Sequence, residues 1–222
     1  MIFFRTIGWI LWKDLLSELR SRESISSMLF FALSVLLIFS FSFAMDREVI
    51  HKVIAGLMWV AFGFTAIIGL GRSFTVELQN DCLEALQISP VSKGAVYLGK
   101  LLANLLFILC VELLLLPLFV IFFNLDILEK VPVLLVIMVG GTLGLSAIGT
   151  LFSALTAQIR SREVMFPILL LPMAVPVFIG AVEATRAALI GQSIRPWIDL
   201  LAVFDLVFIV LSFWIIDFVL DN

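Results

Sequence analysis

Apolar residues in this 222-residue chain gather in six runs, each long enough to cross a lipid bilayer as a helix. The runs are continuous and lack the alternation of membrane β-strands, so they predict helices rather than a barrel. The sixth run contains Asp199, Asp205 and Asp217, and we favour a span with an acidic face over a helix lying in the interface. The predicted spans are 25–45, 53–71, 101–123, 131–157, 164–182 and 197–220.

The segment before the first span, 1–24, predicts an amphipathic helix. Leu11, Leu15 and Leu16 fall on one side of it, whereas Lys13 and Asp14 fall on the other. Charged residues interrupt its apolar run, which argues against a signal peptide. We expect the helix to lie flat on the inner membrane surface. The alternative is a cytoplasmic helix packed on a partner protein.

The loop 72–100 between the second and third spans carries an acidic helical stripe. Glu77, Asp81 and Glu84 recur at intervals of four and three residues, beside an apolar stripe that begins at Phe74. Anionic lipid would repel such a face, so it favours docking to a soluble partner. The alternative is a solvated helix without a partner.

Basic residues set the expected orientation. With the N-terminus inside, nine of the 14 Lys and Arg residues lie on the inner side. This excess favours an inner N-terminus, and an even number of spans brings the C-terminus to the same side.

Composition places the chain in a membrane and excludes several classes of function. Hydrophobic residues make up 63% and charged residues 14%, far from the balance of a soluble domain. The net charge of −3 argues against nucleic-acid binding. Two separated cysteines and the single histidine, His51, form no metal-ligand or catalytic pattern. We therefore expect an all-α membrane protein of one domain, with no catalytic residue, no bound metal and no enzymatic activity of its own.

Three polar side chains interrupt the apolar runs. Glu112 lies near the middle of the third span, Asn104 lies two turns earlier on nearly the same side, and Asp205 lies in the sixth span. Polar groups at that depth are costly and mark a site of substrate or proton handling, unless they only fix helix packing. Both readings stay open. We expect Glu112 to be protonated or hydrogen-bonded and to face protein.

Small residues and prolines suggest how the helices pack. Gly140, Gly141, Gly144 and Gly149 give the fourth span a surface that permits close helix contact. In the fifth span, three prolines remove backbone donors, so that span is expected to kink or to be interrupted. They are Pro167, Pro172 and Pro176.

The stretch G-A-V-Y-L-G-K-L nearly matches a phosphate-binding loop but is rejected as one. Leu101 replaces the hydroxyl residue that binds magnesium, and no strand precedes the stretch. We expect Lys100 to extend toward the inner headgroups instead. If ATP drives this protein, another chain binds it.

Several motifs resemble the haem exporter protein B family, the CcmB-type permease subunits of cytochrome c maturation. The most specific are R-S-F-x-x-E-x-x-x-D-x-L-E-x-L at 72–86 and L-P-M-A-V-P around Pro172 and Pro176. They follow G-L-M-W-V-A, which begins at Gly56, and run in the family's order.

The resemblance implies an ABC-type complex in the bacterial inner membrane. An ATPase subunit would dock on Arg72, Phe74, Glu77, Asp81 and Glu84, which would form a coupling helix. The implied partners are a second copy of the chain, the haem-handling membrane protein C, the small protein D and the periplasmic haem chaperone E. ATP would bind to the partner. Haem itself, or the loaded chaperone, would be what is moved or released.

Other functions stay open at this point. The same architecture serves ABC permeases for a drug, a lipid or a polysaccharide. A non-transporting scaffold would tolerate neutral residues at Glu112 and Asp205. An ion-coupled secondary transporter would show internal inverted repeats, and none is visible.

Overall fold

The computed structural model describes residues 2–20, 22–42, 47–74, 77, 91–125 and 127–221. The described residues form long α-helices and one short 3₁₀-helix, and no strand occurs among them. The all-α membrane fold expected from the sequence is therefore confirmed. The elements are α1 (Ile2–Arg20), α2 (Arg22–Ser42), α3 (Arg47–Arg72), α6 (Lys93–Phe123), η1 (Leu128–Lys130), α7 (Val131–Thr156), α8 (Arg162–Ile190) and α9 (Arg195–Asp221).

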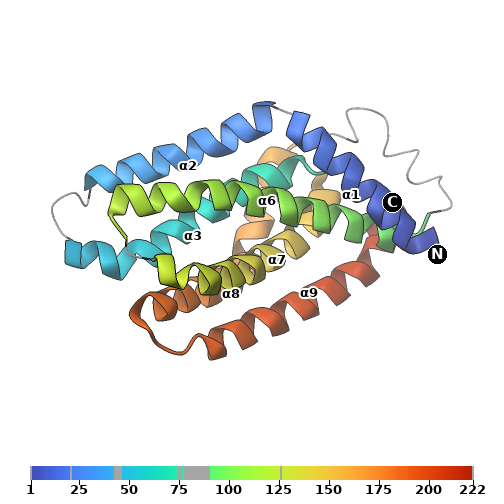
Figure 1. Ribbon diagram of the computed structural model, residues 1–222. Helices are drawn as coiled ribbons and strands as arrows, with labels where there is room; N and C mark the ends of the chain where they lie inside the picture. The colour runs from blue at the N-terminus through green and yellow to red at the C-terminus, as the bar shows by residue number, and fades with distance from the viewer. Residues whose placement is uncertain are drawn as a thin grey trace.

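Six of these helices, α2, α3, α6, α7, α8 and α9, are long and apolar enough to cross a membrane. The sixth, α9, runs unbroken through its three aspartates, as the preferred reading of the sequence predicted. The N- and C-termini lie at the same end of the bundle (Figure 1), which is the consequence of an even number of spans. We call this the terminal end of the bundle.

Several helices are longer than the predicted spans, α6 and α8 by the most. α6 begins at Lys93, eight residues before the predicted start, and α8 continues to Ile190, eight residues beyond the predicted end. The early turns of α6 are buried because Gly94 admits the Phe213 ring of α9 and Gly99 admits Ile10 of α1. The glycines of the rejected phosphate-loop pattern are therefore packing positions.

The centre of the bundle is α7, which packs against α3, α6, α8 and α9. Its glycines allow this close approach, as the sequence predicted. A Cβ added at Gly141 would lie 2.1 Å from the Trp59 ring of α3, and one at Gly149 would lie 2.5 Å from Leu70. The outer helices α2 and α9 expose large apolar side chains such as Phe41 and Trp214, as lipid-facing helices do.

The three prolines do not interrupt α8, which continues as one helix from Arg162 to Ile190. Pro172 and Pro176 are exposed on its outer face, and Pro167 is half-buried. Their rings therefore point mainly away from the core, where they displace no neighbouring helix. The sequence predicted a kink or an interruption of this span; the interruption does not occur, and the kink stays a prediction.

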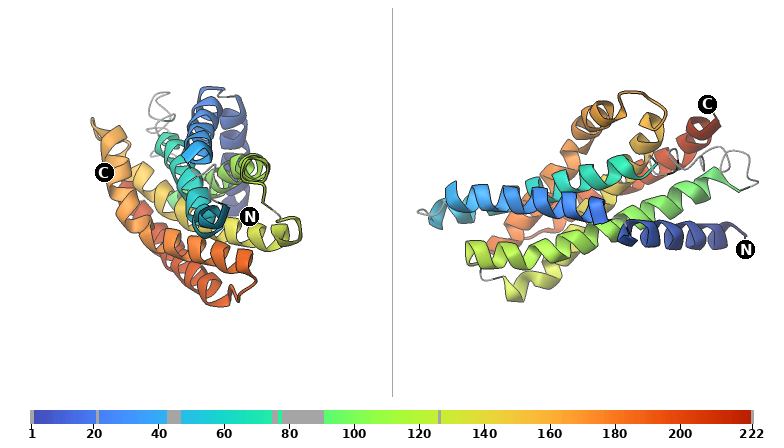
Figure 2. Two further views of the ribbon diagram at one scale, coloured as in Figure 1. Left: turned by 90° about the vertical axis from the view of Figure 1, so that its left-hand side faces the viewer. Right: turned by 90° about the horizontal axis from the view of Figure 1, so that it is seen from above.

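The first helix, α1, packs along the first half of α6 and runs obliquely to the bundle (Figures 1 and 2). Phe4, Trp9 and Trp12 stay exposed, whereas Asp14 turns toward α6. Asp14, which the sequence placed on the polar face of this helix, therefore lies on the side that packs against α6, where it pairs with Lys100. The position of α1 on a membrane surface stays a prediction.

Candidate functional site

Four charged residues from three parts of the chain meet beside the start of α6. We call them the ion cluster: Lys13, Asp14, Glu77 and Lys100. The Nζ atom of Lys100 lies 2.8 Å from Oε2 of Glu77 and 3.1 Å from Oδ2 of Asp14. Lys13 pairs with Glu77 as well, and its Nζ lies 3.0 Å from Oδ1 of Asp14. The cluster therefore ties α1 and the segment that follows α3 to α6.

Lys100 lies inside the protein, with only 2% of its side chain exposed. In addition to the two carboxylates, it donates a hydrogen bond of 2.9 Å to the carbonyl oxygen of Ser73. Its Nζ also lies 4.6 Å from the centre of the Phe74 ring. Lys100 therefore donates two hydrogen bonds, to Asp14 and to the Ser73 carbonyl, and pairs with Glu77 by charge alone. The prediction that Lys100 extends to the headgroups is wrong, because its charge is satisfied within the protein.

Lys13 occupies the outer side of the ion cluster. Burial lowers the pKa of Lys13, but the carboxylates of Glu77 and Asp14 more than offset that effect and raise it above the usual 10.5. The ammonium form is therefore the one that the cluster holds.

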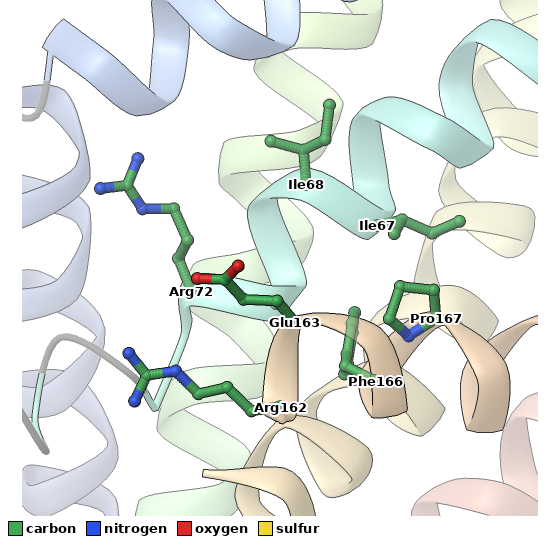
Figure 3. A pocket seen from close by; sticks show the side chains of 8 residues that line it. Ile67, Ile68, Arg72, Arg162, Glu163, Phe166 and Pro167 are labelled. Atoms are coloured by element: carbon green, nitrogen blue, oxygen red, sulfur yellow. The ribbon is translucent and has the colours of Figure 1, made fainter. Parts of the chain in front are cut away.

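The structure places the residues that were expected to dock the ATPase in different surroundings. Glu77 is 4% exposed and Phe74 is fully buried, so neither presents its side chain to a soluble partner in this conformation. Arg72 lies at the end of α3 and lines a cavity of about 450 Å³ against α8 (Figure 3). Asp81 and Glu84 lie outside the described residues.

A second group of polar side chains continues from the ion cluster into the bundle. The side-chain nitrogen of Asn104, on α6, donates hydrogen bonds of 3.0 Å to the hydroxyl of Ser73 and 2.9 Å to the hydroxyl of Thr150, on α7. Asn104 is 9% exposed and Thr150 is fully buried. Asn104 therefore joins α6 to both α7 and the end of α3.

Further along α6, the carboxyl group of Glu112 is fully buried and faces α7. The hydroxyl oxygen of Thr142 lies 2.9 Å and 2.8 Å from its two oxygens. A hydroxyl has one proton to donate, so a protonated acid that donates in return would satisfy both contacts. Glu112 thus faces protein and is hydrogen-bonded, as its depth in the apolar run led us to expect.

These contacts define a register between α6 and α7. Asn104 and Glu112 are eight residues apart, as are their partners Thr150 and Thr142, so the register places Ile108 opposite Ser146. The hydroxyl of Ser146 is buried and has no hydrogen-bond partner among the described residues. We call Asn104, Glu112, Thr142, Ser146 and Thr150 the polar seam.

Asp205 does not belong to the polar seam. It is 5% exposed on α9 and packs against Gly144, where an added Cβ would lie 2.6 Å from its Oδ1 atom. That oxygen has no hydrogen-bond partner within the described part of the chain. Because Gly144 and Thr142 point to different sides of α7, the structure separates Asp205 from Glu112.

Sequence reasoning missed two members of the ion cluster. Lys13 and Asp14 were assigned to the solvated face of the first helix. For the polar contacts of α6, however, the sequence did contain a signal. Lys100, Asn104, Ile108 and Glu112 follow at intervals of four, which puts three polar residues on one face of α6. The partner stripe on α7 is Thr142, Ser146 and Thr150 at the same spacing.

Comparison with known proteins gives a consistent family assignment. The family model described as CcmB protein matches residues 5–220. A protein of Pseudomonas aeruginosa named heme exporter protein B is 29% identical over 78% of this chain and 76% of its own length. Proteins of the same name from Rhodobacter capsulatus and Haemophilus influenzae are each 27% identical. They cover 87% and 85% of this chain, and 88% and 83% of their own lengths.

Proposed function

The chain belongs to the CcmB family, and from that premise we propose that it is the permease subunit of an ABC-type complex in cytochrome c maturation. It is a multi-pass membrane protein. The name of its relatives, heme exporter protein B, supports a part in haem export. ATP hydrolysis by a separate ATPase subunit would drive either the export of haem or the release of a haem-loaded periplasmic chaperone.

The observation that carries the coupling proposal is the ion cluster. The segment between α3 and α6 would receive the ATPase, with Asp81 and Glu84 as its docking charges. Glu77, in the same segment, pairs with Lys100 of α6 and with Lys13 of α1. Movement of this segment would therefore be passed to α6 through the contact between Glu77 and Lys100. This assigns Glu77 the role of an anchor, whereas the sequence alone suggested a contact surface.

The polar seam extends this mechanical connection. Ser73, whose carbonyl oxygen accepts from Lys100, also accepts from Asn104 through its hydroxyl. Asn104 contacts Thr150, and Glu112 contacts Thr142, both on the central helix α7. Movement of α6 would thus change contacts on α7, which packs against four other helices.

The expected setting of the complex follows the family. We propose an inner-membrane location with both termini in the cytoplasm, and partners that include a second copy of this chain, membrane proteins C and D, and the chaperone E. The inner excess of Lys and Arg and the shared end of the two termini support this orientation.

The docking proposal is tested by reversing the charges of Asp81 and Glu84. A tagged chain carrying Asp81→Lys and Glu84→Lys should insert normally but retain at most about a tenth of the co-purifying ATPase, since adverse charge at an interface costs several kcal/mol. Haem-stained cytochrome c should fall in parallel. A complex that keeps its ATPase and its cytochrome c yield would refute the assignment.

The matched control reverses acids elsewhere on the chain. Glu183→Lys with Asp199→Lys adds the same charge away from the segment between α3 and α6. It should leave ATPase retention unchanged. An exporter of a drug, lipid or polysaccharide would lose its ATPase in the docking variant while cytochrome c yield stayed constant, so the two readouts together separate that alternative.

A further inference from the structure

A groove runs between α3 and α8 and contains two cavities. The cavity at the terminal end of the bundle measures about 450 Å³, and the second, deeper among the spans, measures about 280 Å³. Ile67 lines both, so they adjoin. The α3 residues that line them recur at intervals of three and four and therefore share one face of the helix.

The end of the groove at the terminal end is basic. Arg72 of α3 and Arg162 of α8 line the first cavity, with Glu163 beside them. Figure 3 shows all three charged side chains extending to the same side, while Phe166 and Pro167 form an apolar wall. Guanidinium groups bind carboxylates and phosphates through paired, charge-assisted hydrogen bonds.

The deeper end of the groove is apolar. Trp59, Phe64 and Phe178 line the second cavity, and none of the described residues that line it is charged. Gly56 leaves its far end open, because a Cβ added there would meet nothing within 4 Å. From Ile67 to Gly56 the groove follows α3 for about 16 Å at 1.5 Å per residue. That is close to one leaflet, half of a hydrocarbon core about 30 Å thick.

We propose that this groove binds an amphiphile with an anionic head and an apolar body. The head would lie between Arg72 and Arg162, and the body would lie along α3 past Ile67 toward Gly56. Basic pockets between membrane helices at the cytoplasmic side bind anionic lipid headgroups. A porphyrin that carries carboxylates also combines an anionic head with an apolar body. The porphyrin as ligand rests on the proposed function, whereas the lipid as ligand does not.

Two probes distinguish the sources in the purified full-length chain, without an ATPase. Iron protoporphyrin is titrated in detergent and followed by its absorbance. Separately, phosphatidylglycerol and phosphatidylcholine compete for the protein in mixed micelles, and retained lipid is counted by native mass spectrometry. Tight binding of the porphyrin identifies a cargo site. Selective retention of phosphatidylglycerol, with weak porphyrin binding, identifies a lipid site.

Variants test both ends of the groove. Arg72→Gln with Arg162→Gln should weaken binding of the favoured probe at least tenfold. Gly56→Phe fills the apolar cavity and should weaken it about tenfold. Glu163→Gln removes the competing carboxylate and should strengthen binding several-fold, a gain that a damaged fold would not produce.

Two control variants make the same kinds of change outside the groove. Arg5→Gln removes a positive charge from the exposed side of α1, outside the groove. Gly8→Phe adds a ring at another open glycine, also on α1. Both should bind like the wild type. Equal weakening by Arg5→Gln, unchanged binding in the double arginine variant, or no binding of either probe to the wild type would overturn the proposal. Each of these results leaves the ATPase docking proposal intact.

Discussion

Lys100 and Glu77 place opposite charges 2.8 Å apart where their side chains are only 2% and 5% exposed. A buried ion pair is stable only if the remaining donors and acceptors find partners. Asp14 and the carbonyl oxygen of Ser73 supply them for Lys100, and Lys13 supplies a second cation for Glu77. The pair is therefore the point at which α1, the segment after α3 and α6 are joined.

Glu112 allows the packing and functional readings to be separated. Glu112→Gln keeps shape and hydrogen bonding with Thr142 but removes titration, so we expect a nearly unchanged complex and cytochrome c yield. Glu112→Leu leaves the Thr142 hydroxyl without this partner and should cost about 1–3 kcal/mol, seen as a lower yield of assembled complex. A stable, fully assembled Gln variant that matures no cytochrome c would show that the carboxyl group handles protons or substrate.

Within the polar seam, Asn104 and Ser146 should respond in opposite ways. Asn104→Leu deprives Ser73 and Thr150 of a hydrogen-bond donor and should lower stability by about 1–3 kcal/mol. Ser146→Ala removes a buried hydroxyl that has no hydrogen-bond partner among the described residues and should be neutral or stabilising. Thermal unfolding in detergent measures both. A destabilised Ser146→Ala variant would contradict this prediction, because it would show that the hydroxyl makes a stabilising hydrogen bond in the folded protein.

Two adjacent glycines of α7 provide a matched test of its packing. Gly141→Ala forces a methyl group into the Trp59 ring and should destabilise the chain by about 1–3 kcal/mol. At Gly140 the nearest atom lies 3.6 Å from the added Cβ, so Gly140→Ala should be neutral or stabilising by up to about 1 kcal/mol. Equal unfolding temperatures for the two variants would contradict the packing of α7 against α3.

The raised pKa of Lys13 predicts how its contribution to the stability of the folded protein depends on pH. Its pKa is raised above 10.5 in the folded protein, so its contribution is complete below pH 10.5 and is lost as pH rises through the raised value. The difference in unfolding temperature between wild type and Lys13→Gln should therefore stay constant from pH 8 to about pH 10 and shrink above pH 10.5. A difference that disappears below pH 9 would show that Lys13 is not held by Glu77 and Asp14.

The spans could be predicted from the sequence because lipid imposes length and apolarity on each helix separately. Helix ends were harder to place, because protein contacts bury them. Lys93 to Lys100 are polar enough to resemble a loop, yet Gly94 and Gly99 let α9 and α1 cover them. Pro172 and Pro176 misled in the other direction: each removes one backbone donor, yet α8 continues through both as one helix.

The site was only partly predictable. The depth of Glu112 in an apolar run indicated a buried, hydrogen-bonded acid, because hydrocarbon leaves no other low-energy state. The partner Thr142 could not be named, since a single sequence does not give the register between two helices. Asp14 was harder still, because a charge on an amphipathic helix is usually solvated. Its burial depends on Lys100, 86 residues away.

The central claim is that Glu77 transmits the action of the ATPase from the docking segment to α6. Glu77→Gln tests it most directly, because the amide keeps the size of the side chain but removes the charge that holds Lys100 and Lys13. The measurement is the ratio of cytochrome c matured to ATP hydrolysed by the assembled complex. We predict a complex that assembles and hydrolyses ATP, with this ratio at least about tenfold lower, because removing one partner of a buried ion pair costs about 3–5 kcal/mol by leaving the other charge uncompensated. An assembled Glu77→Gln complex with an unchanged ratio would contradict the account.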